Sequence, residues 1–210
     1  MDTNVNLAAP VGALMLLATG LLIFLVTVWL VESLIVRKMK RAKVIAILYG
    51  AITGLYLASV LGFSFASQEK VLARGQEKHF CELDCHLAYS IAKVTQRNST
   101  STFSETVITI KTRFDETTIA PWRGNGLLYP NRRVLTLFDD HGNRYVPASQ
   151  TGTAFTTPLR PGESYTTDVV FNLPRDAKPA KLLINEGDWI THLVIGHENS
   201  PLHSKTEFEL

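Results

Sequence analysis

The segment VGALMLLATGLLIFLVTVWLV, residues 11–31, contains no charged side chain. A second uncharged segment, VIAILYGAITGLYLASVLGFSFAS, follows at residues 44–67. A helix crosses the hydrocarbon core of a bilayer with about 20 consecutive apolar residues, and each segment is long enough to do so. The sequence therefore predicts a transmembrane hairpin over residues 1–67, with helices at about 10–36 and 44–67.

The first apolar segment differs from a cleaved signal peptide in two respects. No Lys or Arg precedes it in residues 1–10. Its apolar stretch also exceeds the roughly 7 to 15 residues of a signal-peptide core. We therefore expect the segment to remain in the mature protein as a membrane anchor.

Basic residues are concentrated in the short loop between the two predicted helices, at residues 37–43. The loop contains Arg37, Lys38, Lys40, Arg41 and Lys43. Because cytoplasmic loops carry an excess of Lys and Arg, this loop is expected in the cytoplasm and both termini on the other side. This topology predicts an integral membrane protein whose remaining chain is extracytoplasmic.

Small residues recur along the second predicted helix with a spacing of four. They are Gly50, Gly54, Ala58, Gly62 and Ala66. Residues four apart share a helix face, and small side chains let another helix approach closely enough for van der Waals packing in lipid. The neighbour is either the first helix of the same chain or a helix of a partner subunit, and the sequence favours neither.

The rest of the chain is predicted to be an all-β domain at residues 80–210, joined to the helices by a polar linker at 68–79. Apolar and polar residues alternate at 81–91, and the same period recurs at 106–114 and 165–173. A period of two is typical of strands with one buried face. We expect each of these segments to be a strand.

Turn-forming residues divide the remainder of the domain into short elements. The segments 139–143 and 185–188 predict hairpins, the second of which continues into a strand at 190–195. Residues 120–131 are rich in Pro and Gly and predict a long surface loop. About seven short strands in ~130 residues are typical of an immunoglobulin-like sandwich, which is the fold class we expect.

The turns of this domain resemble those of a known group of domains. Residues 137–145, 159–163 and 170–174 are similar to telokin-like, immunoglobulin-like domains of uncharacterised bacterial surface proteins. The resemblance covers roughly residues 81–195, and it implies a fold and an extracytoplasmic location without implying an activity. Together with the predicted topology, it implies a protein of the bacterial inner (plasma) membrane whose β domain is periplasmic. Such domains usually follow a lipoprotein signal, whereas this domain follows a two-helix hairpin.

Cys81, Cys85 and His86 are the residues that most suggest chemistry. They allow a variant c-type haem attachment site, although the usual spacing has two residues between the cysteines and here there are three. Two thiolates and a His also suit copper. The third reading is structural, because in an extended strand the two cysteines lie ~13 Å apart, too far for a disulfide or a shared metal. A local turn would instead permit a disulfide in an oxidising compartment.

The layout also resembles subunit II of haem-copper oxidases. That family has an external N-terminus, two membrane spans and an external β-sandwich, and it binds copper through two cysteines separated by three residues. Its cysteines lie near the C-terminal end of the domain, with a downstream His and Met. In this chain they open the first predicted strand, and no Met follows Met39. The copper site of the family is therefore not carried over.

No catalytic motif is apparent in the sequence, neither a Gly-x-Ser-x-Gly elbow nor a Gly-rich phosphate loop. Residues 68–210 contain 16 basic and 17 acidic residues, and this neutral balance argues against binding to nucleic acid. We expect a non-catalytic, membrane-anchored accessory or scaffold subunit that contacts the bilayer and another membrane protein subunit, without a cofactor. The alternative is an electron-transfer or copper- or haem-handling module that uses Cys81, Cys85 and His86.

The long loop and the residues after it are the predicted contact surface for a partner. They contain Trp122, Arg123, Arg132 and Arg133. Trp and Arg are the residue types enriched among interface residues that contribute most to binding.

Overall fold

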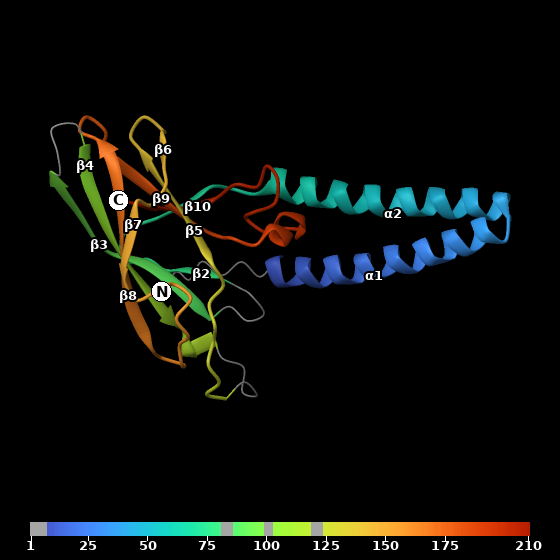
Figure 1. Ribbon diagram of the computed structural model, residues 1–210, viewed down its shortest axis with the longest axis horizontal. Helices are drawn as coiled ribbons and strands as arrows, with labels where there is room; N and C mark the ends of the chain where they lie inside the picture. The colour runs from blue at the N-terminus through green and yellow to red at the C-terminus, as the bar shows by residue number, and fades with distance from the viewer. Residues whose placement is uncertain (1–7, 81–85, 99–102, 119–123) are drawn as a thin grey trace. The chain divides into compact units, whose positions relative to one another are not determined.

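The computed structural model describes residues 8–80, 86–98, 103–118 and 124–210 (Figure 1). The chain divides into two compact units. One unit contains two long helices together with residues 190–204. The other contains the β-strands, from residues 69–189 and 205–210.

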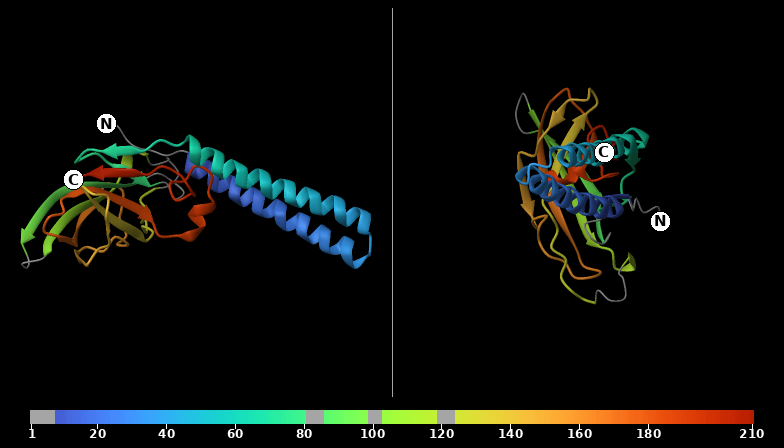
Figure 2. Two further views of the ribbon diagram at one scale, coloured as in Figure 1. Left: turned by 90° about the horizontal axis from the view of Figure 1, so that it is seen from above. Right: turned by 90° about the vertical axis from the view of Figure 1, so that its right-hand side faces the viewer.

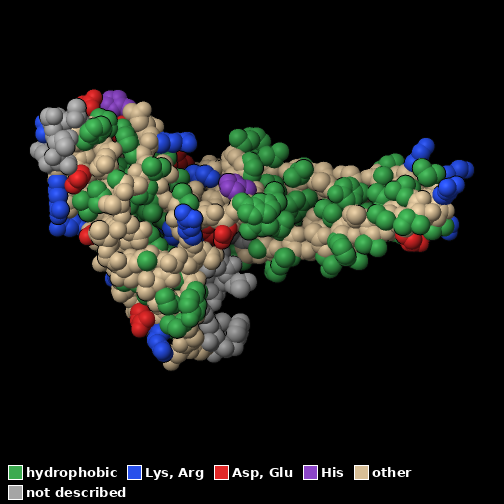
Figure 3. Space-filling view, in the orientation of Figure 1, with side chains coloured by type: hydrophobic (Ala, Val, Ile, Leu, Met, Phe, Trp, Pro, Cys, Tyr) green, Lys and Arg blue, Asp and Glu red, His purple; other side chains and the backbone are tan. Residues whose placement is uncertain are grey.

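The helices α1 (Ala8–Ile35) and α2 (Met39–Ala66) lie side by side at their connected end and separate toward the other end (Figure 1; Figure 2 shows two further views). Both are long and apolar enough to cross a membrane. Their outward side chains are apolar and exposed, for example Leu17 at 70% and Leu55 at 73%. Figure 3 shows these hydrophobic side chains along both helices and basic side chains at the connected end. A helix in water would carry polar residues on that face.

The two helices contact each other through a repeating pattern. In the part of α1 after Gly12, which faces Ile195, the least exposed residues are spaced alternately by three and four, at Leu16, Thr19, Ile23, Val26, Leu30 and Ser33. A seven-residue repeat is typical of helices that pack along a left-handed seam. The basic loop is shorter than predicted, because α2 begins at Met39 rather than at 44 and includes Lys40, Arg41 and Lys43.

The strands form two five-stranded sheets. The first sheet, in spatial order, consists of β1 (Lys70–Leu72), β10 (Thr206–Glu209), β9 (Pro179–Glu186), β5 (Arg133–Asp139) and β6 (Arg144–Tyr145). The second consists of β2 (Lys78–Phe80), β3 (Leu87–Asn98), β4 (Phe103–Phe114), β8 (Ser164–Pro174) and β7 (Ser149–Gly152). Neighbouring strands are antiparallel except for β1 and β10, which are parallel. The short 3-10 helices η1 (Glu116–Thr118) and η2 (Trp189–Leu193) complete the described elements.

The core of the sandwich lies between the inner faces of the two sheets. Alternate residues of β4 and β8 are buried, which confirms the strands predicted at 106–114 and 165–173. Ile108 and Phe171 from one sheet and Leu182 from the other have no exposed surface. Burying a side chain of this size contributes about 1.5–3 kcal/mol. The predicted β-sandwich is thus present beside two apolar helices.

Two predictions about the start of the domain are wrong. The linker at 68–79 contains β1 and the first residues of β2, so the sheets begin earlier than expected. Of the strand predicted at 81–91, residues 81–85 lie outside the described residues and β3 begins at Leu87. Residues 87–91 are all buried rather than alternately exposed. Ala88 lies in a cross-strand row between His79 and Arg113.

The strand predicted at 190–195 is also wrong. These residues form η2 and the turn that follows it. They have no partner strand among the described residues and belong to the unit of the two helices. The alternation of apolar and polar residues there reflects packing in turns rather than in a sheet.

Candidate functional site

A groove of about 370 Å³ opens on the sandwich beside the start of β5. One wall is formed by residues 132–135, and a second by Val146 and Pro147, which follow β6. Gln150 of β7 and residues 154–156 complete it. The groove therefore lies where one strand of each sheet faces the other.

The groove exists because the chain changes sheet after β6. Tyr145 is the last residue of β6 that pairs with β5, and in the same register Pro147 would come opposite Leu135. Proline has no N–H to donate and cannot continue a ladder there. Ala148 instead donates its N–H to the carbonyl oxygen of Val170 in β8, at 2.8 Å. As a result, no described strand lies beside β5 at Leu135.

The edge of β5 presents backbone groups to this groove. The N–H of Gly187 donates to the carbonyl oxygen of Arg132 at 2.9 Å, so Arg132 directs its backbone groups toward the chain that follows β9. Hydrogen-bonded residues alternate along an antiparallel strand. Leu135, three residues on, therefore directs its N–H and C=O away from β9 and toward the groove. An edge of this kind accepts a further extended strand.

The two arginines at the groove have different environments. Arg133 is buried, its guanidinium lies 4.3 Å from the centre of the Phe80 ring, and its Nε donates to the Tyr89 hydroxyl at 3.1 Å. Its Nη1 lies 3.6 Å from the carboxylate of Glu186. The prediction that Arg133 is a surface contact is therefore wrong, because this side chain is part of the core. Arg132 is exposed, and no carboxylate among the described residues forms an ion pair with it.

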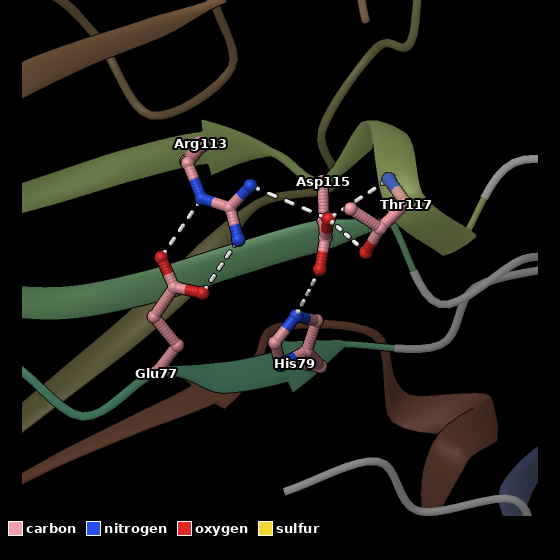
Figure 4. A network of polar contacts seen from close by, with 5 residues as sticks. All are labelled: Glu77, His79, Arg113, Asp115 and Thr117. Carbon is pink, nitrogen blue, oxygen red and sulfur yellow. Dashed lines mark hydrogen bonds and ion pairs between the residues drawn. The ribbon is translucent and has the colours of Figure 1, made fainter. Parts of the chain in front are cut away.

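A cluster of charged side chains joins the start of β2 to the end of β4 (Figure 4). Arg113 donates from Nε and Nη2 to the two carboxylate oxygens of Glu77, at 2.9 and 2.6 Å. Its Nη1 donates to Asp115 at 3.3 Å. The hydrogen bonds to Glu77 raise the pKa of Arg113, and they lower the pKa of Glu77. Because β3 lies between β2 and β4, the cluster ties three strands together.

Asp115 is the centre of this cluster. Its Oδ1 accepts hydrogen bonds from the N–H and hydroxyl of Thr117, at 3.0 and 2.7 Å. Its Oδ2 lies 3.0 Å from Nε2 of the buried His79. Burial raises the pKa of Asp115, but the hydrogen bonds from Thr117 and His79 outweigh it and hold that pKa well below its usual range. The carboxylate is therefore ionised at any physiological pH.

Glu77, His79 and Asp115 offer ligand atoms within 4.8 Å of one another. Three such ligands are enough for many metal sites. Here the guanidinium of Arg113 already forms ion pairs with both carboxylates. The position of a metal ion is thus taken by a cation of the chain itself, and we interpret the cluster as structural.

Of the predicted cysteine motif, only His86 is described, while Cys81 and Cys85 lie outside the described residues. The His86 ring is buried and stacks on Phe114 with 5.3 Å between ring centres. The distance argument against a shared metal assumed a strand through both cysteines, but β3 begins after His86. The copper or haem site stays a prediction. Trp122 and Arg123 of the predicted contact surface also lie outside the described residues.

The small-residue face of α2 does not contact α1. Its five residues, Gly50, Gly54, Ala58, Gly62 and Ala66, are all exposed. A methyl group added at Gly50, Gly54 or Gly62 would meet no atom within 4 Å. The seam with α1 uses the opposite side of the helix, which includes Ile45 and Val60. Packing against the first helix, one of the two alternatives from the sequence, is therefore wrong.

The comparisons with known proteins give one structural similarity. No protein-family model matches the chain. No curated protein matches it either. An uncharacterised β-sandwich protein from Clostridium difficile 630 is similar in structure, with a TM-score of 0.41 and 9% sequence identity, over 69% of this chain and 95% of that chain.

Proposed function

We propose that this chain is a non-catalytic accessory or scaffold subunit of a membrane protein complex. In this proposal α1 and α2 anchor it in a bacterial plasma membrane, and the immunoglobulin-like sandwich lies on the extracytoplasmic side. The sandwich binds an extended segment of a partner protein in the groove beside β5. The observation that carries the proposal is the open edge of β5 at Leu135, which Pro147 leaves without a neighbouring strand.

The chemistry of the groove selects the kind of segment that fits. An extended chain beside Leu135 gains main-chain hydrogen bonds of the kind used in strand addition. Val134 and Val146 are 48% and 76% exposed and offer apolar contacts to its side chains. Arg132 at the mouth favours an acidic residue, because its charge is not opposed by a described carboxylate. The partner segment is therefore extended and carries a carboxylate next to an apolar residue.

Features of the helices support the membrane part of the proposal. The basic residues at 37–43 favour a cytoplasmic loop, which places the sandwich outside. The exposed small-residue face of α2 suits close packing with a helix of another subunit. A helix that contacts only lipid does not require small residues along one face.

Co-purification from the native membrane tests the groove. We expect native mass spectrometry of the gently extracted protein to show an additional subunit. The double variant Arg132→Glu and Val146→Glu should weaken that association by about tenfold or more, since like charges at an interface cost several kcal/mol. Arg175→Glu with Val71→Glu makes the same charge change at exposed positions elsewhere on the sandwich and should have no effect.

The outcomes separate the parts of the proposal. A chain that never co-purifies with another subunit would contradict the scaffold function. A partner that binds the groove variant as tightly as wild type would place the contact elsewhere. Copper or haem mass on the chain would favour the electron-transfer alternative at Cys81, Cys85 and His86.

The helix face has its own test. Gly54→Leu introduces a large side chain on the small-residue face and should reduce co-purification. Gly20→Leu in α1 is the matched control, because Gly20 is also exposed and has no atom within 4 Å of an added methyl group. Equal loss in both variants would mean that the face has no specific partner.

A further inference from the structure

Residues 190–204 pack along the helix pair rather than in the sandwich. The hydroxyl of Tyr56 donates to the carbonyl oxygen of Leu193 at 2.8 Å. Ser204 donates its N–H to Oγ of Ser67 at 2.8 Å, just after α2 ends. On α1, an added Cβ at Gly12 would collide with the carbonyl oxygen of Ile195. Contacts with both helices thus hold this segment at one end of the pair.

The contact with Tyr56 shows how far the segment reaches along α2. Tyr56 lies ten residues before Ala66, the last residue of the helix, which corresponds to about 15 Å. Each helix has 28 residues, about 42 Å. A bilayer is about 40–45 Å thick with its headgroups, and its hydrocarbon core is about 30 Å. If the helices cross a membrane, Leu193 lies at or below the boundary between headgroups and hydrocarbon.

Consecutive turns satisfy part of the backbone of this segment. The N–H groups of Val194, His197, Ser200 and His203 each donate to the carbonyl oxygen three residues earlier, at 3.3, 3.1, 2.9 and 3.1 Å. Internal hydrogen bonds of this kind are what a non-helical chain needs at membrane depth, because lipid offers no partners.

Some side chains in this segment are arranged differently from those of a loop in water. Its polar residues Asn199 and Thr191 are buried and hydrogen-bonded to each other at 2.8 Å. Val194 and Ile195 are buried as well, but Ile190 and Leu202 are 46% and 67% exposed, and Trp189, the residue before Ile190, is 72% exposed. Leu202 holds a positive φ of 63°, a backbone conformation that a branched residue rarely adopts, and so presents its side chain at a turn. Trp is a residue type that anchors proteins at the interface between membrane and water.

We infer that residues 189–204 form an interfacial collar, which inserts Trp189, Ile190 and Leu202 into the headgroup region of a phospholipid bilayer beside the helix pair. The inference rests on the proposed function in one respect, namely that α1 and α2 cross the membrane. It adds a second lipid-binding element, which fixes the depth of the anchor. Ile190 and Leu202 belong to the same compact unit as the two helices, whose outward side chains are apolar.

Fluorescence quenching in vesicles tests the collar on the full-length protein. The chain has three Trp residues. One variant retains Trp189, with Trp29→Phe and Trp122→Phe. The second retains Trp29 in α1, with Trp122→Phe and Trp189→Phe. Both are reconstituted into phosphatidylcholine vesicles with or without lipids brominated near the carbonyl end of the acyl chain.

Bromolipids should quench both Trp residues, and Trp189 emission should be blue-shifted relative to Trp in water. Adding Ile190→Glu and Leu202→Glu to the first variant should reverse the shift and the quenching of Trp189. Tyr129→Glu, at a 65% exposed position of the sandwich outside the groove, is the control and should change neither. If Trp29 is quenched and Trp189 is not, the collar is wrong while the anchor stands. If neither is quenched, the membrane anchor is wrong and the collar with it.

Discussion

Apolar side chains face inward in the sandwich and outward in the helix pair. Ile108 in β4 has no exposed surface, whereas Leu17 in α1 and Leu55 in α2 are at least 70% exposed. Polar groups beside the helices are turned in, as Asn199 shows. Burial from water stabilises the sandwich, but lipid gives no such gain between helices, which associate through close packing. The difference indicates that the two units are adapted to different surroundings.

A Leu→Ala substitution should affect the free energy of unfolding in the sandwich but not on the outer face of the helix pair. Leu182→Ala removes a fully buried side chain from the sandwich and should lower its free energy of unfolding by about 2–5 kcal/mol. Leu55→Ala, on the exposed face of α2, should leave that free energy unchanged. The measurement is denaturant unfolding of the full chain in detergent micelles, followed by near-ultraviolet circular dichroism. Equal effects would show that the face of Leu55 is covered by protein.

The charged cluster shows that the sandwich tolerates partly buried charges when they are paired. Arg113→Met leaves the carboxylates of Glu77 and Asp115 without their shared cation. It should lower the free energy of unfolding by about 1–3 kcal/mol, because a hydrogen bond to a charged group contributes about that much. The Arg113 side chain is only 24% exposed, so water screens the interaction little. Lys181→Met is the control, since its pairs with Glu69 and Glu207 lie at the surface and should contribute less than about 1 kcal/mol. Thermal unfolding of both variants checks the order, and a larger loss from Lys181→Met would contradict it.

Acid should weaken the sandwich through the turn after β5. Burial raises the pKa of Asp139, but hydrogen bonds from Asn143 and Tyr145 dominate and lower it to about 2. A carboxylate whose pKa is lowered by folding stabilises the native state above its ordinary pKa of about 4, and this contribution is lost as the pH falls toward 2. In Asp139→Asn, the free energy of unfolding should therefore fall less between about pH 4 and about pH 2 than it does in the wild type. Denaturant titrations at several pH values measure it, and an unchanged slope would contradict the assignment.

The parts of the fold that depend on local pattern could be predicted from the sequence. Two uncharged segments are enough to indicate the helices, and strict alternation indicates β4 and β8. Prediction from the local sequence pattern failed where contacts between residues distant in the sequence determine burial. Ala88 is buried between His79 and Arg113 on neighbouring strands, and alternation within β3 alone could not reveal this.

The candidate sites were predictable only in part. Arg132 follows a loop, as a contact residue would, but the groove beside it depends on the register that brings Pro147 opposite Leu135. The sequence contains the proline but not the register. Similarly, alternation at 190–195 does not distinguish a strand from turns that hide polar groups against two helices. That the small-residue face packs against another helix stays a prediction, and its direction away from α1 required the structure.

Two glycines of α1 give the smallest and most local test of the comparison. Gly20 faces open space, so Gly20→Ala should be neutral or should stabilise the helix by up to about 1 kcal/mol. Gly12→Ala gains the same helix propensity, but its Cβ meets the carbonyl oxygen of Ile195, a backbone atom that moves only with its whole turn. Hydrogen exchange of the full chain in micelles should therefore show faster exchange in residues 194–203 for Gly12→Ala alone, with the strands of the sandwich unchanged. Equal protection in both variants would mean that residues 190–204 do not pack on the helices. The exposed apolar side chains of that segment would then not be held beside the helix pair, and the proposed membrane contact would lose its basis.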